Sequence, residues 1–290
     1  MNPYKKISII LAFVVGTVNF TVSAQQAKVL NLDKNVHAIS LMGYTSLVVE
    51  GDNEVLITDT ANPVRANILK KEIEKLTDKP VGKIVLTHEH FDHTGGTEVF
   101  KDAEIIAQKN VKNLDGLDPL DLFPDTIDIL FEKHLTINLG TTVVELKYLG
   151  AADGAAIAVV HLPKERIVVT SDMYTDEGIN EGIFLSHTNL LGTRYLLKTI
   201  LSWNLNHSIN THSSRTDITH LKETVAFLDD LYEAIISRLK KMDKNNGHEL
   251  LNEVFRLKKS LKLPKYKDWK NYKDLPVYIQ KMGYDIIHGG

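Results

Sequence analysis

Four side chains that can bind a metal ion lie within six residues of the sequence: His88, His90, Asp92 and His93. Imidazole nitrogens and carboxylate oxygens are ligands that zinc and similar divalent cations accept. The apolar run Ile84–Leu86 before them predicts a short buried strand, and Gly95-Gly96 after them allows a tight backbone turn. A solvated, histidine-rich loop is the plainer alternative, but this spacing favours a metal site at the end of a strand.

Other potential ligands also follow strand-like runs. Asp59 follows Val55–Thr58, Asp172 follows the run that begins at Ile167, and His212 ends the short run that begins at Ser208. In layered α/β proteins, functional sites gather at the ends of strands. Asp172 and His212 are therefore candidates for the same site. A carboxylate that merely ends a strand in a turn remains the alternative for Asp59.

The elements around these residues follow an α/β order. Leu47–Val49 and Val55–Ile57 flank Gly51-Asp52-Asn53, which predicts a β-hairpin. Asn62-Pro63 predicts a helix start, because a capping side chain is followed by proline at the first helical position. A strand, a helix, a second strand and the ligand loop then follow in turn. This order favours an α/β chain with central sheets.

The middle of the chain is predicted to contain mostly strands. The expected elements are a hairpin from Leu135–Leu139 and Thr142–Tyr148, strands at Ala155–Leu162 and Ile167–Thr170, and a helix at Leu190–Trp203. Leu114–Thr126 is predicted to be a loop. Its apolar residues would either cover the mouth of a site or pack on their own domain.

The C-terminal part changes character. Apolar residues from Leu221 to Leu239 recur every three or four positions, which predicts an amphipathic helix. Asn246-Gly247 should end it, and His248–Lys259 should form a shorter helix. The remaining residues mix tyrosine and tryptophan with lysine. We expect this aromatic tail to pack back on the core, with binding of a sugar or nucleic acid as the alternative.

Composition limits the class of protein. The chain has 290 residues, of which 43% are hydrophobic and 24% are charged, and its formal net charge is -3. These values suit one soluble globular domain with a modest extension, and no basic excess indicates nucleic acid as a partner. The chain has no cysteine, so disulfides, cysteine-ligated zinc and a thiol nucleophile are excluded.

The amino terminus is typical of a secretory signal peptide. Lys5 and Lys6 precede a mostly apolar stretch from Ile7 to Val22, and small residues follow at Ser23-Ala24. We therefore expect residues 1–24 to be removed and the mature protein to be periplasmic or secreted, without an integral membrane segment. An uncleaved membrane anchor is the alternative.

The pattern His88-x-His90-x-Asp92-His93 resembles the signature of the metallo-β-lactamase superfamily. The resemblance implies a four-layer αββα sandwich over residues 25–216, with residues 217–290 forming C-terminal helices and an aromatic tail packed on the same domain. It also implies two neighbouring metal sites. His88 and His90 would belong to site 1, Asp92, His93 and His212 to site 2, and Asp172 would bridge both.

The resemblance further implies a supporting role for Asp59, which would fix the orientation of a metal-bound histidine through a hydrogen bond. The chain departs from the family at the third histidine of site 1. Counting from Gly150 and from Leu162-Pro163 both place Asp153 at that position. Three outcomes remain open: Asp153 ligates the metal of site 1, one site is weakened or lost, or the protein is inactive.

The implied activity is metal-dependent hydrolysis, with a metal-activated water attacking an ester, lactone, sulfate-ester or related bond. Asp92 would orient or deprotonate that water. The expected cofactor is one or two zinc ions, with manganese or iron as alternatives. The partner would be a small-molecule substrate, and an oligomer is compatible with the sequence.

Three side chains close to the ligands in sequence are candidate substrate contacts: Tyr174, His187 and His220. Competing functions are a β-lactamase-like amide hydrolase, a non-catalytic metal- or ligand-binding protein with a degenerate site 1, and an iron-dependent oxidoreductase.

Overall fold

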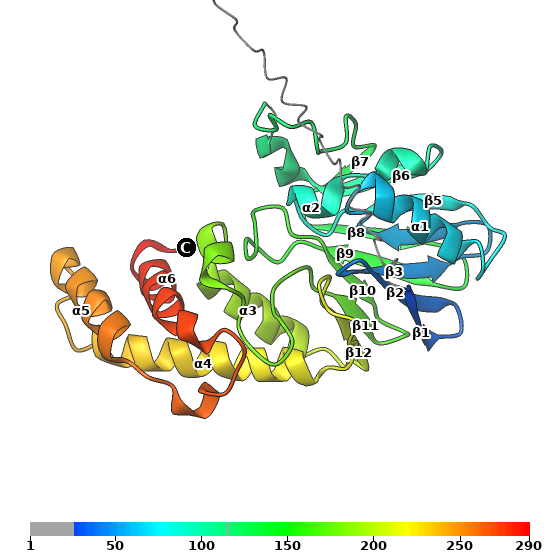
Figure 1. The fold of residues 1–290 in the computed structure, drawn as a ribbon. Coiled ribbons are helices and arrows are strands. Elements are labelled where there is room, and N and C mark those ends of the chain that lie inside the picture. Colours follow the sequence, from blue (N-terminus) through cyan, green and yellow to red (C-terminus); the bar gives the residue numbers. More distant parts are fainter. Residues whose placement is uncertain (1–25, 115) are drawn as a thin grey trace, which may run out of the picture.

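The computed structural model describes residues 26–114 and 116–290, so the predicted signal peptide lies outside the described residues. Two β-sheets form the centre of the molecule (Figure 1). The first has seven strands in sequence order: β1 (Lys28–Asp33), β2 (Val36–Leu41), β3 (Tyr44–Glu50), β4 (Val55–Thr58), β5 (Val81–Val85), β6 (Glu104–Gln108) and β7 (Ile129–Phe131). The second has five, in the order β12 (His207–Ile209), β11 (Ile167–Val169), β10 (Val159–Leu162), β9 (Val143–Lys147) and β8 (His134–Asn138).

Six α-helices accompany the sheets within the described residues: α1 (Pro63–Ile73), α2 (Phe91–Thr94), α3 (Leu190–Leu201), α4 (Thr219–Leu239), α5 (Gly247–Ser260) and α6 (Leu275–His288). Short 3-10 helices include η1 (Thr97–Val99) and η3 (Gly182–Ser186). In Figure 1, α1 and α2 lie beside the first sheet, whereas α3 to α6 lie on the other side of the second sheet. None of the helices in residues 26–114 and 116–290 combines the length and the apolar character needed to cross a bilayer.

Alternation along the strands builds the layers. Leu47 and Leu56 of the first sheet pack against residues such as Leu146 of the second, whereas Val48 faces the opposite core together with Leu69 of α1. Successive side chains of a strand point to opposite faces, so one strand can serve both cores. Residues of β10 and β11 similarly alternate between the inter-sheet core and a core shared with α3, α4 and α6. The predicted αββα arrangement is therefore confirmed.

Strand direction determines where the site lies. Strands β4, β5, β6 and β7 are parallel to one another, as are β11 and β12. Parallel strands end at the same edge of a sheet. Asp59 and His88 therefore emerge near each other from the first sheet, and Asp172 and His212 emerge near each other from the second.

One predicted strand is shorter than expected. The apolar run that begins at Ala155 joins the sheet at Val159, not at its start. The backbone N–H groups of Ala155 and Ala156 donate to the Glu89 carboxylate, and that of Ala158 donates to the carbonyl of Thr87. These bonds tie the segment to the ligand loop and replace a strand ladder.

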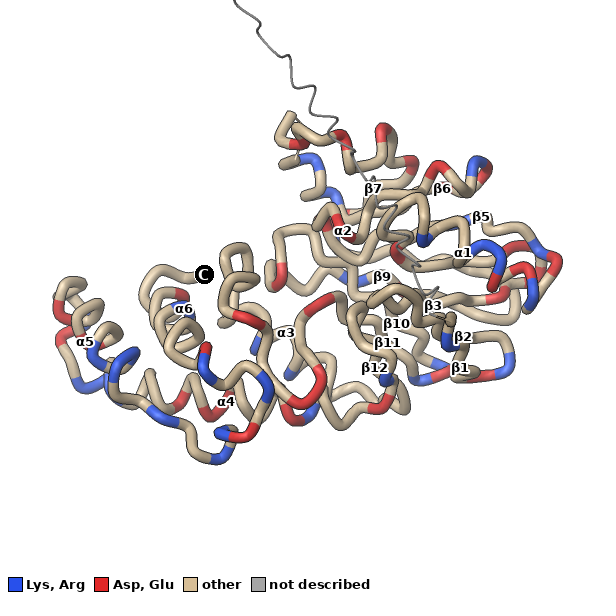
Figure 2. The backbone as a smooth tube through the Cα atoms, in the orientation of Figure 1, with Lys and Arg blue, Asp and Glu red and all other residues tan. Residues whose placement is uncertain are grey.

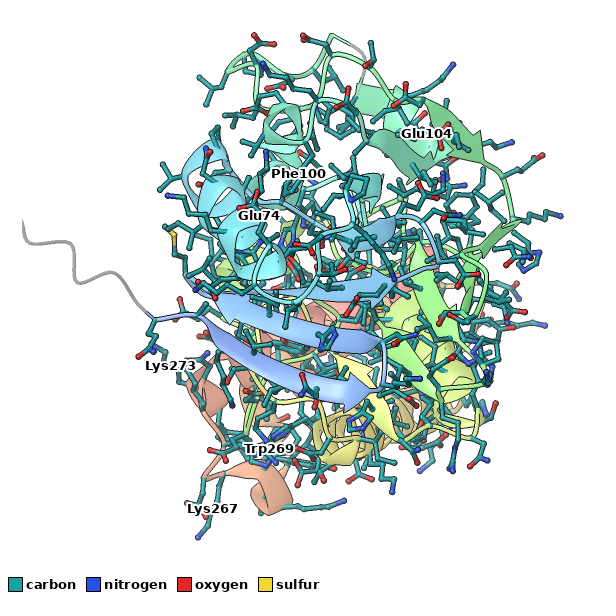
Figure 3. The ribbon with its side chains drawn as sticks, turned by 90° about the vertical axis from the view of Figure 1, so that its right-hand side faces the viewer. Glu74, Phe100, Glu104, Lys267, Trp269 and Lys273 are labelled. Carbon is teal, nitrogen blue, oxygen red and sulfur yellow. The ribbon has the colours of Figure 1, made fainter. Side chains whose placement is uncertain are left out.

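The C-terminal helices share a core with the second sheet. Val159 and Val168 belong to the same buried cluster as Leu228 of α4 and Ile279 of α6. The sequence did not indicate α6 as a helix, and the expected aromatic tail is instead helical from Leu275 onwards. Trp269 of the preceding segment packs against Phe227 of α4, with ring centroids 5.6 Å apart. Figure 3 shows Trp269 on this segment, close to Lys267.

A fully buried arginine, Arg65 of α1, holds the loops beside the site. Its guanidinium donates to the carbonyls of Leu41, Tyr44, Asp59 and Thr60 and to the hydroxyl of Ser46. Burial lowers the pKa of Arg65 to about 10, although the nearby Asp59 opposes the shift. Arg65 therefore remains charged at neutral pH, and its charge is met by carbonyl dipoles of two separate turns.

Replacement of Arg65 by lysine should destabilise the fold. An ammonium group cannot reach all five acceptors, and each buried acceptor left without a donor costs about 1–3 kcal/mol. We expect Arg65→Lys to lower the free energy of unfolding in urea by about 2–4 kcal/mol. The matched control is Lys70→Gln, an exposed position of the same helix, which should change it by less than about 0.5 kcal/mol. Equal stability of the two variants would contradict this role for Arg65.

Candidate metal centre

The ligand loop after β5 places its histidines at the interface of the two sheets. His88 is fully buried, and its Nε2 atom has no hydrogen-bond partner within the described residues. That atom lies 3.5 Å from Oδ2 of Asp172. A buried polar atom without a partner is unfavourable. The orientation of His88 therefore needs an explanation beyond packing.

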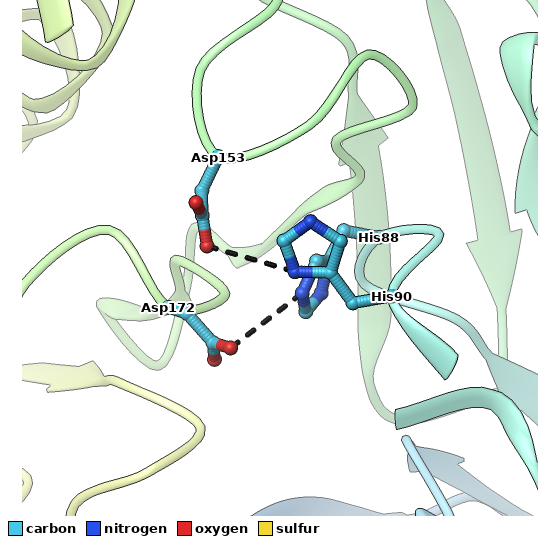
Figure 4. A group of neighbouring side chains, drawn as sticks. All are labelled: His88, His90, Asp153 and Asp172. Atoms are coloured by element: carbon cyan, nitrogen blue, oxygen red, sulfur yellow. Dashed lines mark ion pairs between the residues drawn. The ribbon is translucent and has the colours of Figure 1, made fainter. Parts of the chain in front are cut away.

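The first ligand group consists of His88, His90, Asp153 and Asp172 (Figure 4). One nitrogen or oxygen atom from each side chain lies within 4.8 Å of the others. His90 Nδ1 is 3.9 Å from Oδ2 of Asp153. The structure thus brings Asp153 to the two histidines of the predicted site 1.

The second group consists of Asp92, His93 and His212. His93 Nε2 lies 3.2 Å from His212 Nε2, and the two nitrogens are 3.4 and 3.6 Å from Asp92 Oδ2. Burial opposes protonation of His212, but its hydrogen bonds to Asp172 and Asp92 outweigh burial and raise its pKa to about 10. The carboxylates thus favour the protonated form of His212, and a divalent cation would have to displace that proton.

Asp172 joins the two groups. Its Oδ2 atom lies 3.0 Å from His93 Nε2, 3.1 Å from His212 Nε2 and 3.5 Å from His88 Nε2, while Thr211 donates to its other oxygen. Burial opposes ionisation of Asp172, but the surrounding imidazoles outweigh it and hold its pKa well below the usual range. One carboxylate oxygen therefore faces ligands of both predicted sites.

The Asp59 carboxylate holds the ligand loop through hydrogen bonds to Thr87 and His93. It accepts hydrogen bonds from the backbone N–H of Thr87 at 2.8 Å and from the Thr87 hydroxyl at 2.7 Å. Its Oδ2 also lies 3.2 Å from His93 Nδ1. Asp59, His88 and His93 are close enough to form a third group, but Asp59 is engaged by these donors. The geometry suits a residue that orients His93, which leaves His93 Nε2 facing the other ligands.

Asp153 is held by its surroundings. Thr188 donates to its Oδ1 at 2.7 Å, which leaves Oδ2 toward His90. Burial raises the pKa of the Asp153 carboxyl, although His88 opposes the shift. The next residue, Gly154, has a φ of +105°, and a Cβ atom there would lie 2.6 Å from the Glu89 carboxylate. Glycine at this position therefore lets the Asp153 loop approach the ligand loop.

Two residues of the site were missed by the sequence reasoning. Tyr44 donates from its hydroxyl to Asp92 Oδ2 at 3.4 Å, and its ring lies against those of His93 and His212. Burial, followed by the charge of Asp92, raises the pKa of Tyr44. Glu89 anchors the Asp153 loop through the two backbone bonds described above. The position of Glu89 between two ligand histidines was a usable signal, whereas nothing near Tyr44 indicated its role.

The three candidate substrate contacts lie in different environments. His187 lines a pocket that the candidate ligands also line, and its ring centroid is 6.4 Å from that of His90. Tyr174 lines the same pocket, but its hydroxyl lies 2.7 Å from the hydroxyl of Ser208. His220 is buried on α4, where Nδ1 lies 3.3 Å from Glu223. The structure does not bring His220 to this pocket, because the residue lies on the buried face of the helix.

The pocket itself has a volume of about 940 Å³. Its lining includes His90, Asp92, Asp153, Asp172 and His212. Ligand sites in proteins commonly have volumes of several hundred Å³. The candidate ligands are therefore open to a small molecule.

The family model of the metallo-beta-lactamase superfamily matches residues 41–211, which is more than half of the chain. The chain belongs to this superfamily. The matched region contains all the candidate ligands apart from His212, which follows it directly. Membership of this superfamily indicates that the chain is a metal-dependent enzyme, usually a hydrolase, that acts on small molecules.

Solved structures agree on the fold. A metallo-beta-lactamase from Pontibacter korlensis superposes with a TM-score of 0.61 at 19% identity, covering 70% of this chain and 99% of the other. Metallo-beta-lactamase IND-7 gives a TM-score of 0.61 at 16% identity, with 71% and 99% covered. At these identities the similarity supports the architecture alone.

One curated relative matches in part. The 2,4-dinitroanisole O-demethylase subunit alpha of Nocardioides sp. (strain JS1661) is 28% identical over 133 residues. The match covers 44% of this chain and 40% of that protein. The chain therefore spans well under two thirds of the relative's length.

The residues fit the divalent cation that the metallo-β-lactamase superfamily implies. Imidazole nitrogens and carboxylate oxygens converge from two sheets, and the unpartnered Nε2 of buried His88 faces this group. A mixed nitrogen and oxygen donor set suits zinc and is also compatible with manganese or iron. His88, His90, Asp153 and Asp172 would hold one cation, and Asp92, His93, His212 and Asp172 a second.

Loss of the Glu89 charge should loosen the first group. A glutamine can offer one acceptor oxygen where two N–H donors now bind, so the Asp153 loop would lose a bond to the ligand loop. We expect Glu89→Gln to weaken zinc binding by about tenfold, as is typical of residues that orient metal ligands. Competition with a chromophoric chelator measures the affinity. Glu98→Gln, an exposed change nearby in sequence, is the control, and equal affinities of the two variants would refute this role.

Proposed function

We propose that this metallo-β-lactamase superfamily member is an exported zinc-dependent hydrolase that cleaves an ester, lactone, sulfate-ester or related bond. The observation that carries the proposal is the position of Asp172 Oδ2, which faces ligands of both groups at the floor of an open pocket. This arrangement can hold two cations side by side. A pair of cations that shares a carboxylate is suited to hydrolysis of a polarised carbonyl or ester.

The bound cation would supply Lewis acidity and lower the pKa of a water molecule. The chain would supply orientation and proton handling. Asp92 is the ligand-group carboxylate most open to the pocket, since 53% of its side chain is exposed. It can therefore reach the attacking water and orient it, and the Tyr44 hydroxyl that donates to Oδ2 would keep the carboxylate in position.

His187 would act on the substrate side. It lines the pocket, and its ring centroid lies 6.4 Å from that of the ligand His90. Its imidazole can donate a hydrogen bond to a substrate oxygen. The name of the partial relative, an O-demethylase of 2,4-dinitroanisole, is compatible with a target bond between carbon and oxygen. Export rests on the signal-peptide pattern of residues 1–24.

Metal content tests the proposal directly. We expect one or two zinc ions per chain by elemental analysis, and loss of at least about 99% of ester-hydrolysing activity after chelation, because the bound cation is what lowers the pKa of the attacking water. His212→Ala should lower the metal content, and Asp153→His should retain or increase it while Asp153→Ala lowers it.

His134→Ala is the matched control, because this exposed histidine lies on β8 away from the ligand groups. It should leave metal content and turnover unchanged. Full activity of the metal-free protein would overturn the proposed hydrolase. An Asp153→Ala variant with unchanged metal content would overturn ligation by Asp153. Correct secretion with removal of residues 1–24 can be checked by amino-terminal sequencing of the exported protein.

A further inference from the structure

The rim of the pocket is unusually apolar for an exposed surface. Ile183 and Phe184 of η3 line the pocket and are 76% and 66% exposed. Leu117, from a loop distant in sequence, also lines it and is 64% exposed. Large apolar side chains that gather in the open around a cavity commonly mark a binding surface for an apolar ligand.

The η3 part of this rim is well anchored. The backbone N–H of Gly182 donates to Asp274 at 3.1 Å, and the Thr188 hydroxyl, which donates to Asp153, also contacts the Phe184 carbonyl at 3.3 Å. The neighbouring Leu185 is buried. Ile183 and Phe184 are therefore exposed on a segment whose backbone is fixed to both the ligand group and the C-terminal region.

The pocket lining combines acidic residues with histidines. Its acidic residues are Glu89, Asp92, Asp153 and Asp172, and none of the described lining residues is lysine or arginine. Figure 2 shows lysine and arginine on α1, on α5 and along the segment between α5 and α6, and also on η2 (Lys109–Leu114), whose last residue lines the pocket. Apart from any bound cation and ligand imidazoles such as His212, a negatively charged group of a substrate would find no lysine or arginine partner among these residues, and it would lie near four carboxylates.

On the basis of the proposed hydrolase function, we infer that the substrate is an uncharged ester or lactone with a sizeable apolar group, such as a medium-length alkyl chain or an aromatic ring. The apolar group would lie against Ile183, Phe184 and Leu117, and the reacting bond would face His90 and Asp92. Sulfate esters and substrates with a free carboxylate would be poor.

Binding of uncharged and anionic dyes tests the pocket without turnover. Nile red is uncharged and apolar, whereas anilinonaphthalene sulfonate carries a negative charge. We expect saturable Nile red fluorescence with the metal-loaded protein, and at least about fivefold weaker binding after Ile183→Ser and Phe184→Ser together, because both changes remove apolar contact area. Tyr195→Ser, an exposed aromatic position on α3 outside the pocket lining, is the control and should bind as the parent does.

Turnover of matched 4-nitrophenyl esters tests the substrate class. We expect kcat/KM to rise at least about tenfold from butyrate to octanoate, since each buried methylene can favour binding by up to about fourfold. The pentanoate ester should exceed the hydrogen glutarate ester, which replaces its terminal methyl by a carboxylate, by about tenfold or more. Ile183→Lys should narrow this difference by adding a cation at the rim.

The outcomes separate the two proposals. Absence of turnover with every ester, together with tighter binding of Nile red than of anilinonaphthalene sulfonate, would contradict the hydrolase and support the apolar, uncharged character of the ligand. Turnover without dependence on chain length, or glutarate cleaved as fast as pentanoate, would overturn the inference about the substrate while the hydrolase stands. Equal Nile red binding by the parent and the double serine variant would likewise overturn the proposed role of the rim.

Discussion

The arrangement of the site depends on the buried carboxylate of Asp59. It receives the backbone and hydroxyl donors of Thr87, the residue directly before the ligand loop, and it faces the imidazole of His93. The backbone carbonyl of Asp59 accepts a hydrogen bond from the guanidinium of Arg65. A strand end, a helix and the ligand loop therefore meet at one residue, Asp59, in an interior where unmet hydrogen bonds are costly. The orientation of the imidazoles follows from this junction.

The two sheets present different ligands to the site. The first sheet presents most of the imidazoles and secures them through Asp59, whereas the second presents Asp172 and His212 from the ends of β11 and β12. Closing the sandwich over its apolar core brings these groups within hydrogen-bond distance. The packing of the hydrophobic core therefore also positions the ligand groups. The cost of crowding carboxylates is offset by the adjacent imidazoles and, in the proposed enzyme, by the cations.

Much of the fold could be predicted because its signals are local. The hairpin of β3 and β4, the Asn62-capped α1 and the long α4 follow from short patterns of apolar, turn and capping residues. Contacts between residues far apart in the sequence leave no such local pattern. Tyr44 reaches Asp92 only after folding, and the apolar run at Ala155 could not show that Glu89 would replace its strand partners. His220 was a candidate substrate contact because it is close to His212 in sequence. The structure shows that it is buried on α4 instead.

The last helix has a consequence for the time at which the site can form. Asp285 of α6 accepts the backbone N–H of Leu190, two residues beyond Thr188, which holds Asp153. Tyr278 of the same helix lines a small cavity that also touches Asp153 and Asp172. Helix α6 must therefore have left the ribosome before the ligand groups reach their final positions. If the chain is exported unfolded, under the export proposed above, the ligand groups would form and bind metal only after the chain has crossed the membrane.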